Sequence, residues 1–218
     1  AMIYRTIGNT DLSISAIGLG TWAMGNDYWG PAEDNDSIAA IQVALEHGIN
    51  LIDTAPVYGD GHAEEIVGRA IKELRHKPLV ATKVGEYRIG DTFAVDLSPE
   101  SIIRQIDSSL SRLGVDTIDL YQIHRPDPAT PLESTVDVLL RLKEQGKFRY
   151  LGVSNFDIHQ LDHIRSIAPV VSLQAHYSLV HRDIESDIVP YCQDHDIGII
   201  GYGTMAGGVL SGKYKGIP

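Results

Sequence analysis

Two hydrophobic periodicities alternate along the chain. Short apolar runs rich in Val, Ile and Leu are typical of buried strands, and they lie at residues 16–22, 50–55, 78–83, 118–124, 149–155, 171–178 and 197–203. Between them, apolar residues recur every three or four positions, as in amphipathic helices. These helical stretches cover residues 36–47, 63–75, 99–113, 132–146, 157–167 and 184–195.

The stretch "SPESIIRQIDSSLSRLG" shows the helical pattern together with its start and stop signals. Ser98 is a residue type that caps helix N-termini, and Pro99 suits the first helical position. Gly114 suits the position just after a helix ends. These signals predict a helix over residues 99–113.

The alternation of strands and helices predicts an α/β fold with a parallel sheet covered by helices. Both a (β/α) barrel and an open doubly wound sheet satisfy this pattern. The opening "MIYRTIGNTDLSISAIG" predicts a separate hairpin with Asn9, Thr10 and Asp11 near its turn. In a barrel, this hairpin would cap the bottom.

Composition and charge narrow the class of protein. Hydrophobic residues make up 43% of the 218 residues, no run is long enough to span a bilayer, and the first residues show no secretory signal. The single cysteine, Cys192, excludes an internal disulfide framework and suits a reducing cytosol, so we expect a cytoplasmic protein. The formal net charge of −11 argues against nucleic acid or an anionic membrane as a partner. This net charge does not exclude an anionic small molecule as a ligand.

Polar side chains stand at the ends of five of the predicted strands. They are Asp53, Lys83, His124, Asn155 and Tyr202. In a parallel barrel the carboxyl ends of all strands open on one face, where active sites lie. The sequence therefore predicts one pocket built from residues far apart in the chain.

Tyr58, in the loop after the second strand, completes a coherent chemical set with Asp53, Lys83 and His124. An ordinary tyrosine titrates near about 10, and a nearby lysine cation lowers that value. The aspartate would keep the lysine charged, and the histidine would hydrogen-bond a substrate carbonyl. Such a site polarises a carbonyl and donates a proton to the forming alkoxide, but the hydride must come from a cofactor.

Each of these residues also fits a purely structural role. Lys83 would be a solvated strand end, Asp53 a loop cap and His124 a structural histidine. Other chemistries find less support. The first strand lacks the histidines of a metal-dependent hydrolase, no G-x-S-x-G nucleophile elbow is present, and "GLGTWAMG" lacks the third glycine of a Rossmann fingerprint.

Several ordered motifs resemble the aldo-keto reductase family. "GINLIDTAPVYGDGHAEEIVGRA" is similar to the family signature around the catalytic aspartate and tyrosine. "ATK", "YQIHRPD", "GKFRYLGVSNF" and "LQAHYSL" resemble later blocks in the correct order, and "GIIGYGTMAGGVLSGKY" resembles the segment over the cofactor pyrophosphate. The resemblance is to short-loop bacterial members, in the branch of inositol-dehydrogenase-like proteins and potassium-channel β-subunits.

The resemblance implies a (β/α)8 TIM barrel that binds NADP(H) without a Rossmann domain. It makes Tyr58 the general acid, tuned by Lys83 and Asp53, with His124 orienting the carbonyl; no metal is implied. The implied cofactor-binding residues are Thr21, Trp22, Asp53, Ser154, Asn155, Gln174, Tyr202, Gly203, Thr204, Met205, Ala206, Gly207 and Lys213.

The resulting hypothesis is an NADP(H)-dependent oxidoreductase that interconverts a small aldehyde, ketone or sugar carbonyl and its alcohol. The alternative is a weakly active or non-enzymatic regulatory subunit that binds NADPH, because such subunits share the same four residues. Trp22, Tyr28 and Trp29, on the loop after the first strand, would either stack on a sugar or pack the loop down. Reaction direction and oligomeric state are left open.

Seven strands are legible, whereas this barrel closes with eight. We therefore expect residues 1–218 to form a single aldo-keto reductase barrel domain that is C-terminally incomplete. Phosphate sites in such barrels use the loops after strands seven and eight. The preference for NADP over NAD accordingly comes from the resemblance alone.

Overall fold

The computed structural model describes residues 2–26, 30–214 and 216. Its centre is a seven-stranded sheet in the order β3-β4-β5-β8-β9-β10-β11, and every neighbouring pair is parallel. The strands are β3 (Leu19–Gly20), β4 (Leu51–Asp53), β5 (Leu79–Val84), β8 (Ile118–Ile123), β9 (Phe148–Ser154), β10 (Ser172–His176) and β11 (Gly198–Tyr202). Each lies within or beside one of the predicted apolar runs.

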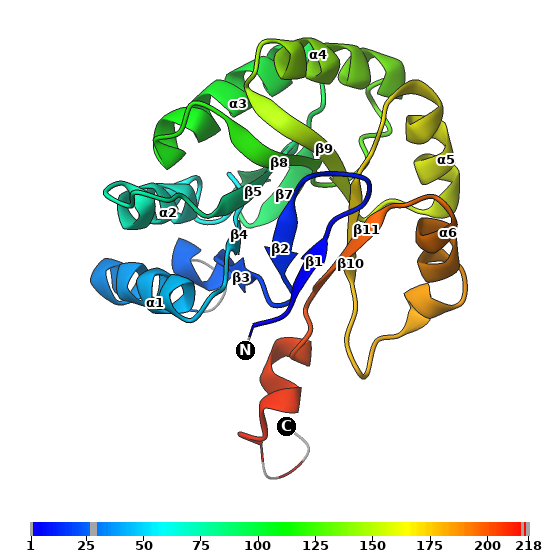
Figure 1. Cartoon of the computed structure of the whole chain (residues 1–218). Helices are drawn as coiled ribbons and strands as arrows, with labels where there is room; N and C mark the ends of the chain where they lie inside the picture. Colours follow the sequence, from blue (N-terminus) through cyan, green and yellow to red (C-terminus); the bar gives the residue numbers. More distant parts are fainter. Residues whose placement is uncertain (1, 27–29, 215, 217–218) are drawn as a thin grey trace.

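Six α-helices of the described residues line the outer face of the sheet, which curls around the centre of the molecule (Figure 1). They are α1 (Asp34–Glu46), α2 (His62–Ile71), α3 (Pro99–Leu113), α4 (Leu132–Glu144), α5 (Ile158–Ile167) and α6 (Ile188–Asp194). Because the helices cover one face only, the sheet is a barrel-type sheet rather than a doubly wound one. The predicted α/β barrel class is confirmed.

The core has two layers because side chains alternate between the faces of each strand. Ile52, Tyr121 and Val153 point outward and join a large cluster between the sheet and the helices. Leu51, Ala81 and Leu120 belong to a smaller cluster inside the curled sheet. This inner cluster fills one end of the barrel with apolar side chains.

The N-terminal hairpin covers that apolar end. It consists of β1 (Tyr4–Thr6) and β2 (Ser13–Ser15), paired antiparallel, and Figure 1 shows it lying across the centre of the sheet. Ile7 and Leu12, at its turn, pack into the inner cluster. Asp11 accepts hydrogen bonds of 2.8 Å from Arg149 Nη2 and 2.9 Å from the Tyr150 hydroxyl. The predicted hairpin and its capping position are confirmed.

One hairpin was not predicted. β6 (Glu86–Ile89) and β7 (Thr92–Val95) pair antiparallel directly after β5. Gly90 forms the turn with Asp91 and has a left-handed φ of 57°, so the "GD" pair between two alternating segments was the available signal. The hairpin brings Glu86 to the edge of the sheet next to the predicted pocket.

Two helix predictions need correction. Residues 184–195 divide into a 3-10 turn, Asp183–Glu185, and helix α6, because the Asp187 carboxylate accepts from Ile188 N and starts a new helix. Ser98 occupies the N-cap of α3, but its side chain makes no cap bond. Instead, the Asp96 carboxylate accepts from Ser98 N at 2.9 Å.

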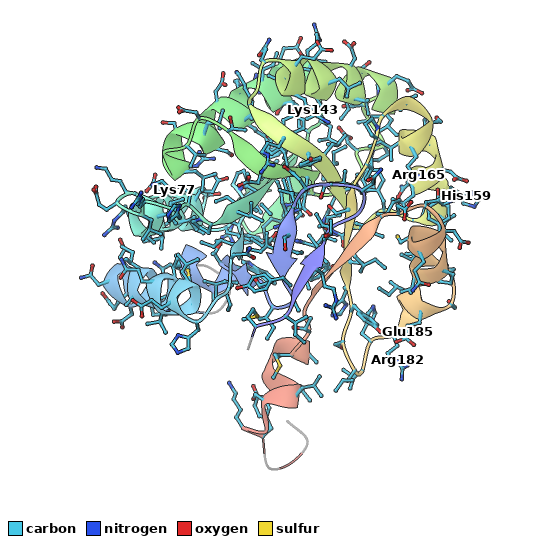
Figure 2. All side chains as sticks on the ribbon, in the orientation of Figure 1. Lys77, Lys143, His159, Arg165, Arg182 and Glu185 are labelled. Carbon is cyan, nitrogen blue, oxygen red and sulfur yellow. The ribbon has the colours of Figure 1, made fainter. Side chains whose placement is uncertain are left out.

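The outer helices are also linked by polar contacts. Arg165, labelled in Figure 2 where α5 meets α6, donates to the Tyr191 hydroxyl at 2.9 Å and contacts His195 Nδ1 at 3.0 Å. Among the described residues, no helix combines the length and the apolar character needed to cross a membrane.

The inner cluster predicts the stability of the hairpin. Leu12 is only 3% exposed, so Leu12→Ala should lower the free energy of unfolding by roughly 2–5 kcal/mol, measured by urea denaturation. Ile17→Ala is the control, because Ile17 is 62% exposed and its truncation should change stability by less than about 0.5 kcal/mol. Equal losses in the two variants would show that Leu12 does not anchor the hairpin.

Candidate active site

Polar side chains replace apolar ones on the inner face of the sheet toward the carboxyl ends of the strands. Along β5, Ala81 of the apolar layer is followed two residues later by Lys83, and along β8 Leu120 is followed by Gln122. Gly152 on β9 makes room for Ser172 and Gln122, because a Cβ there would lie 2.4 Å from Ser172 Oγ and 3.1 Å from Gln122 Cγ. The strand register therefore brings the polar residues into one layer next to the apolar inner cluster.

Lys83 is the centre of this layer. Its side chain is fully buried, and its Nζ donates to Asp53 Oδ1 at 2.7 Å, to the Thr54 carbonyl at 2.9 Å and to the Tyr58 hydroxyl at 3.2 Å. All three donor hydrogens of the ammonium group are thus used. This pattern contradicts the reading of Lys83 as a solvated strand end.

A close backbone contact holds the loop that carries Tyr58. Gly59 has a φ of 63°, and a Cβ at that position would lie 2.1 Å from the Gly25 carbonyl oxygen. Gly25 ends the 3-10 turn Trp22–Gly25, so only glycine allows the two segments to approach this closely. The contact also stacks the rings of Trp22 and Tyr58, with 6.1 Å between their centroids.

Burial and charge set the protonation of Lys83 and Tyr58. Burial lowers the pKa of Lys83, but the Asp53 carboxylate and the Tyr58 hydroxyl outweigh it, so the ammonium pKa is raised. Burial raises the pKa of Tyr58 above its ordinary value, although the Lys83 charge lowers it. The Lys83 charge acts in the predicted direction, but the predicted lowering of the Tyr58 pKa is wrong, because burial outweighs that charge. Tyr58 is therefore a protonated phenol at neutral pH.

His124 directly follows β8 and meets Tyr58 edge to face, with 6.1 Å between the ring centroids. Its Nδ1 lies 3.1 Å from Glu86 Oε2. Burial, followed by the charges of Lys83 and Arg125, holds the pKa of His124 well below its ordinary value. The same Glu86 carboxylate also contacts Arg125, with 2.7 Å between Oε1 and Nε. The imidazole is therefore neutral at neutral pH.

A chain of hydrogen bonds joins this group to the remaining strand ends. Gln174 Nε2 donates to Asp53 Oδ2 at 2.7 Å. Asn155, with a left-handed φ of 61°, donates from Nδ2 to the His124 carbonyl and to Ser154 Oγ, both at 3.0 Å. The Tyr202 hydroxyl donates to Asn155 Oδ1 at 2.9 Å. The structure thus brings these predicted residues together around one mouth.

The remaining predicted residues are placed differently. Thr21 is buried and donates from Oγ1 to the Asp53 backbone carbonyl at 3.1 Å, so it supports β4. The segment after β11 projects away from the barrel (Figure 1), and Lys213 Nζ lies 5.1 Å from the Tyr214 ring centroid. That segment carries Gly203, Thr204, Met205, Ala206 and Gly207. Tyr28 and Trp29 lie outside the described residues.

Three residues of the site were not predicted from the sequence. Gln122 Nε2 donates to Asp53 Oδ2 at 3.4 Å, and its position two residues before His124 on one strand was an available signal. Glu86 and Arg125 contact each other at 2.7 Å. Neither could be placed without the unpredicted hairpin.

The donor set of this layer is suited to acid–base work on an oxygen atom. It contains a buried cation neutralised by a carboxylate, a phenol in contact with that cation, and a neutral imidazole. Across residues 2–26, 30–214 and 216, no group of three or more His, Cys, Asp or Glu side chains is arranged to hold a metal ion.

Comparison with known proteins identifies the family. The family model "Aldo/keto reductase family" matches residues 16–218. The chain is 44% identical over 215 residues to aldo-keto reductase YhdN of Bacillus subtilis, covering 97% of this chain and 65% of that protein. It is 41% identical over 228 residues to the NADH-specific methylglyoxal reductase of Escherichia coli, covering 94% of this chain and 68% of that protein.

Solved structures agree with these relatives. The glycerol dehydrogenase AKR11B4 from Gluconobacter oxydans superposes with a TM-score of 0.90 at 42% identity, over 99% of this chain and 68% of that one. Aldo-keto reductase AKR11C1 from Bacillus halodurans gives 0.88 at 31% identity, over 100% of this chain and 71% of that one. The chain thus spans about two thirds of the length of these proteins. This chain belongs to the aldo/keto reductase family.

Proposed function

We propose that the protein is an NADP(H)-dependent oxidoreductase that interconverts a small carbonyl compound and its alcohol. One observation carries the proposal: the fully buried Lys83 contacts both the Asp53 carboxylate and the Tyr58 hydroxyl, at 2.7 and 3.2 Å. An ion pair this deeply buried costs desolvation free energy. The contact between Lys83 and the Tyr58 hydroxyl supplies a chemical reason for burying the pair.

The proposed roles follow from the protonation states. Tyr58, which is protonated at neutral pH, donates its proton to the carbonyl oxygen during reduction. The phenolate that this leaves is stabilised by the Lys83 ammonium, whose own charge is maintained by Asp53. His124, at the edge of the Tyr58 ring, positions the substrate oxygen.

The strand ends beside Tyr58 fit the nicotinamide end of a dinucleotide. Tyr202 offers a partly exposed ring, and Ser154 and Gln174 supply a hydroxyl and an amide, the chemistry needed to bind a carboxamide. The buried Gln122 Oε1 has no hydrogen-bond partner among the described residues, so the layer retains an acceptor. When bound, a nicotinamide supplies the hydride for reduction or takes it up in oxidation.

The relatives support the class of reaction and leave its details as proposals. One is named a glycerol dehydrogenase and another an NADH-specific methylglyoxal reductase, while a Klebsiella pneumoniae relative was solved with NADPH. We propose NADP(H) as the cofactor, a carbonyl or polyol small molecule as the substrate, and the cytoplasm as the location. The inositol-dehydrogenase-like branch stays a prediction.

Tyr58→Phe should abolish turnover. The variant keeps the ring on Trp22 and removes only the proton donor, so kcat should fall by at least about 100-fold while NADPH affinity stays within a few-fold. Steady-state oxidation of NADPH with a panel of aldehydes, together with NADPH titration, measures both quantities.

Tyr87→Phe is the matched control for Tyr58→Phe. It removes a hydroxyl from the exposed ring of Tyr87 on β6 and should leave kcat unchanged. A Tyr58→Phe variant with wild-type kcat would remove Tyr58 from the mechanism. Tight NADPH binding without turnover by the wild type would favour a regulatory subunit.

The pH dependence of reduction should follow the raised pKa of Tyr58. A general acid is active while protonated, so kcat for reduction should show no titration of Tyr58 through neutral pH. It should fall only above pH ~10, the ordinary value for tyrosine. An alkaline limb between about pH 7 and 9 that is absent from Tyr58→Phe would contradict this account.

Removal of the Lys83 charge should affect both stability and catalysis. Lys83→Met leaves the Asp53 carboxylate without its cation and should cost about 3–5 kcal/mol of unfolding free energy. The double variant Asp53→Asn/Lys83→Met removes both charges and should be more stable than the single variant. Its urea midpoint, compared with that of Lys83→Met, measures the difference. Any residual activity of Lys83→Met should titrate at higher pH than the wild type.

A further inference from the structure

Arg125 is an exposed arginine anchored beside the proposed active site. It directly follows His124 in the loop after β8, and its side chain is 51% exposed. Its Nε donates to Glu86 Oε1 at 2.7 Å. Glu86 is itself only 8% exposed, so the guanidinium is held by a buried carboxylate and has less freedom than an ordinary surface arginine.

The contacts of Glu86 place the guanidinium at the mouth of the site. While Oε1 binds Arg125, Oε2 lies 3.1 Å from His124 Nδ1. The His124 carbonyl in turn accepts from Asn155 Nδ2 at 3.0 Å. One carboxylate thus joins the guanidinium to a residue of the mouth.

Arg125 keeps hydrogen-bond donors for a ligand. A guanidinium has five N–H groups, and within the part of the chain that the structure describes the contact with Glu86 uses the one on Nε. Lys83, the other cation of the site, already has Asp53, Thr54 and Tyr58 as partners. The protein carries a net charge of −11, so an anion would be selected by such short-range donors rather than by the overall field.

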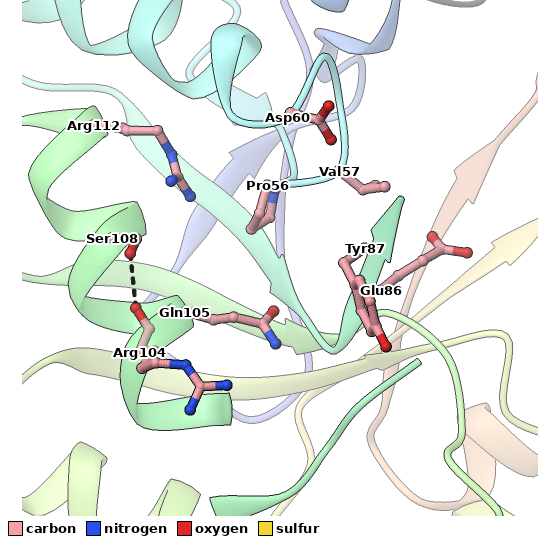
Figure 3. Close-up of a pocket in the computed structure, with 9 residues that line it drawn as sticks. All are labelled: Pro56, Val57, Asp60, Glu86, Tyr87, Arg104, Gln105, Ser108 and Arg112. Carbon is pink, nitrogen blue, oxygen red and sulfur yellow. Dashed lines mark hydrogen bonds between the residues drawn. The ribbon is translucent and has the colours of Figure 1, made fainter. Parts of the chain in front are cut away.

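A neighbouring pocket offers a weaker alternative for an anion. Its volume is about 360 Å³, and it lies between the Tyr58 loop, β6 and α3, where Arg104 and Arg112 line it (Figure 3). Arg112 already pairs with the fully buried Glu64 at 2.6 Å. Figure 3 also shows the Glu86 carboxylate extending away from both arginines. The Glu86–Arg125 pair thus belongs to the mouth of the proposed active site.

We propose that Arg125, held by Glu86, binds an anionic group of the substrate, a carboxylate or a phosphate, and so selects carbonyl compounds or alcohols that carry a negative charge. The proposal rests on the proposed function, because it assumes that the reacting oxygen lies at Tyr58 and His124. The Glu86 carboxylate contacts both Arg125 and His124, so the anionic group would lie a few bonds from the reacting carbon. A planar guanidinium matches both anions through paired hydrogen bonds.

Two matched substrate pairs test the proposal and separate the two anions. Succinic semialdehyde against butanal tests a carboxylate, and glyceraldehyde 3-phosphate against glyceraldehyde tests a phosphate. With the natural full-length protein and NADPH, we expect the charged member of at least one pair to have the lower KM. That advantage should shrink as ionic strength rises.

Arg125→Gln should raise the KM of the preferred charged substrate by roughly tenfold to a hundredfold more than it raises the KM of the neutral partner. Arg125→Lys should recover part of the loss, because it restores the charge without the planar fork. Arg141→Gln removes an equal charge from an exposed i,i+4 pair on α4 and should leave all four KM values unchanged.

A binding measurement separates failure of this proposal from failure of the proposed function. If none of the four aldehydes is reduced, their affinities can still be compared by tryptophan fluorescence, to which Trp22 beside Tyr58 contributes. Tighter binding of a charged member that Arg125→Gln abolishes would support the proposal. Equal or weaker binding of both charged members, or equal effects of Arg125→Gln on charged and neutral partners, would overturn it.

Discussion

The buried pair of Lys83 and Asp53 is the interaction on which the polar layer depends. The ammonium group of Lys83 has no exposure, and it stays charged in the interior because a carboxylate and further acceptors surround it. Asp53 supplies the charge, and its second oxygen accepts from Gln174 and Gln122. One ion pair thus fixes side chains from β4, β5, β8 and β10. The geometry of the proposed proton donor is a consequence of this arrangement.

The sequence was sufficient to predict the parallel sheet, because each buried strand interrupts the helical periodicity with a short apolar run. The seven strands and six helices lie where these runs and periodicities predict them, with small shifts at the ends. The β6–β7 hairpin was missed because only Glu86 among its eight strand residues is buried, so its strands lack a long apolar run. Only the turn residues Gly90 and Asp91 indicated the hairpin in the sequence.

The site was predictable where chemistry and strand position coincide. Asp53, Lys83 and His124 end apolar runs, so the barrel topology alone predicts that they meet. Gln122 followed from the same alternation, yet an amide inside a strand attracts less notice than a charged residue at its end. The contact between Glu86 and Arg125 could not be predicted without the β6–β7 hairpin, which carries Glu86. The raised pKa of Tyr58 could not be predicted from the sequence either, because the burial of one side chain depends on packing from several elements.

The hairpin that closes the bottom of the barrel has a consequence for how the chain acquires its structure. Its residues precede the central strands in the chain, but Asp11 is bound by Arg149, 138 residues later. The inner cluster likewise joins Leu12 to Leu120. Contacts this distant in sequence form late, because the closure of long loops must precede them. We therefore expect the hairpin to remain undocked until at least β9 has been synthesised, and its docking to close the barrel floor.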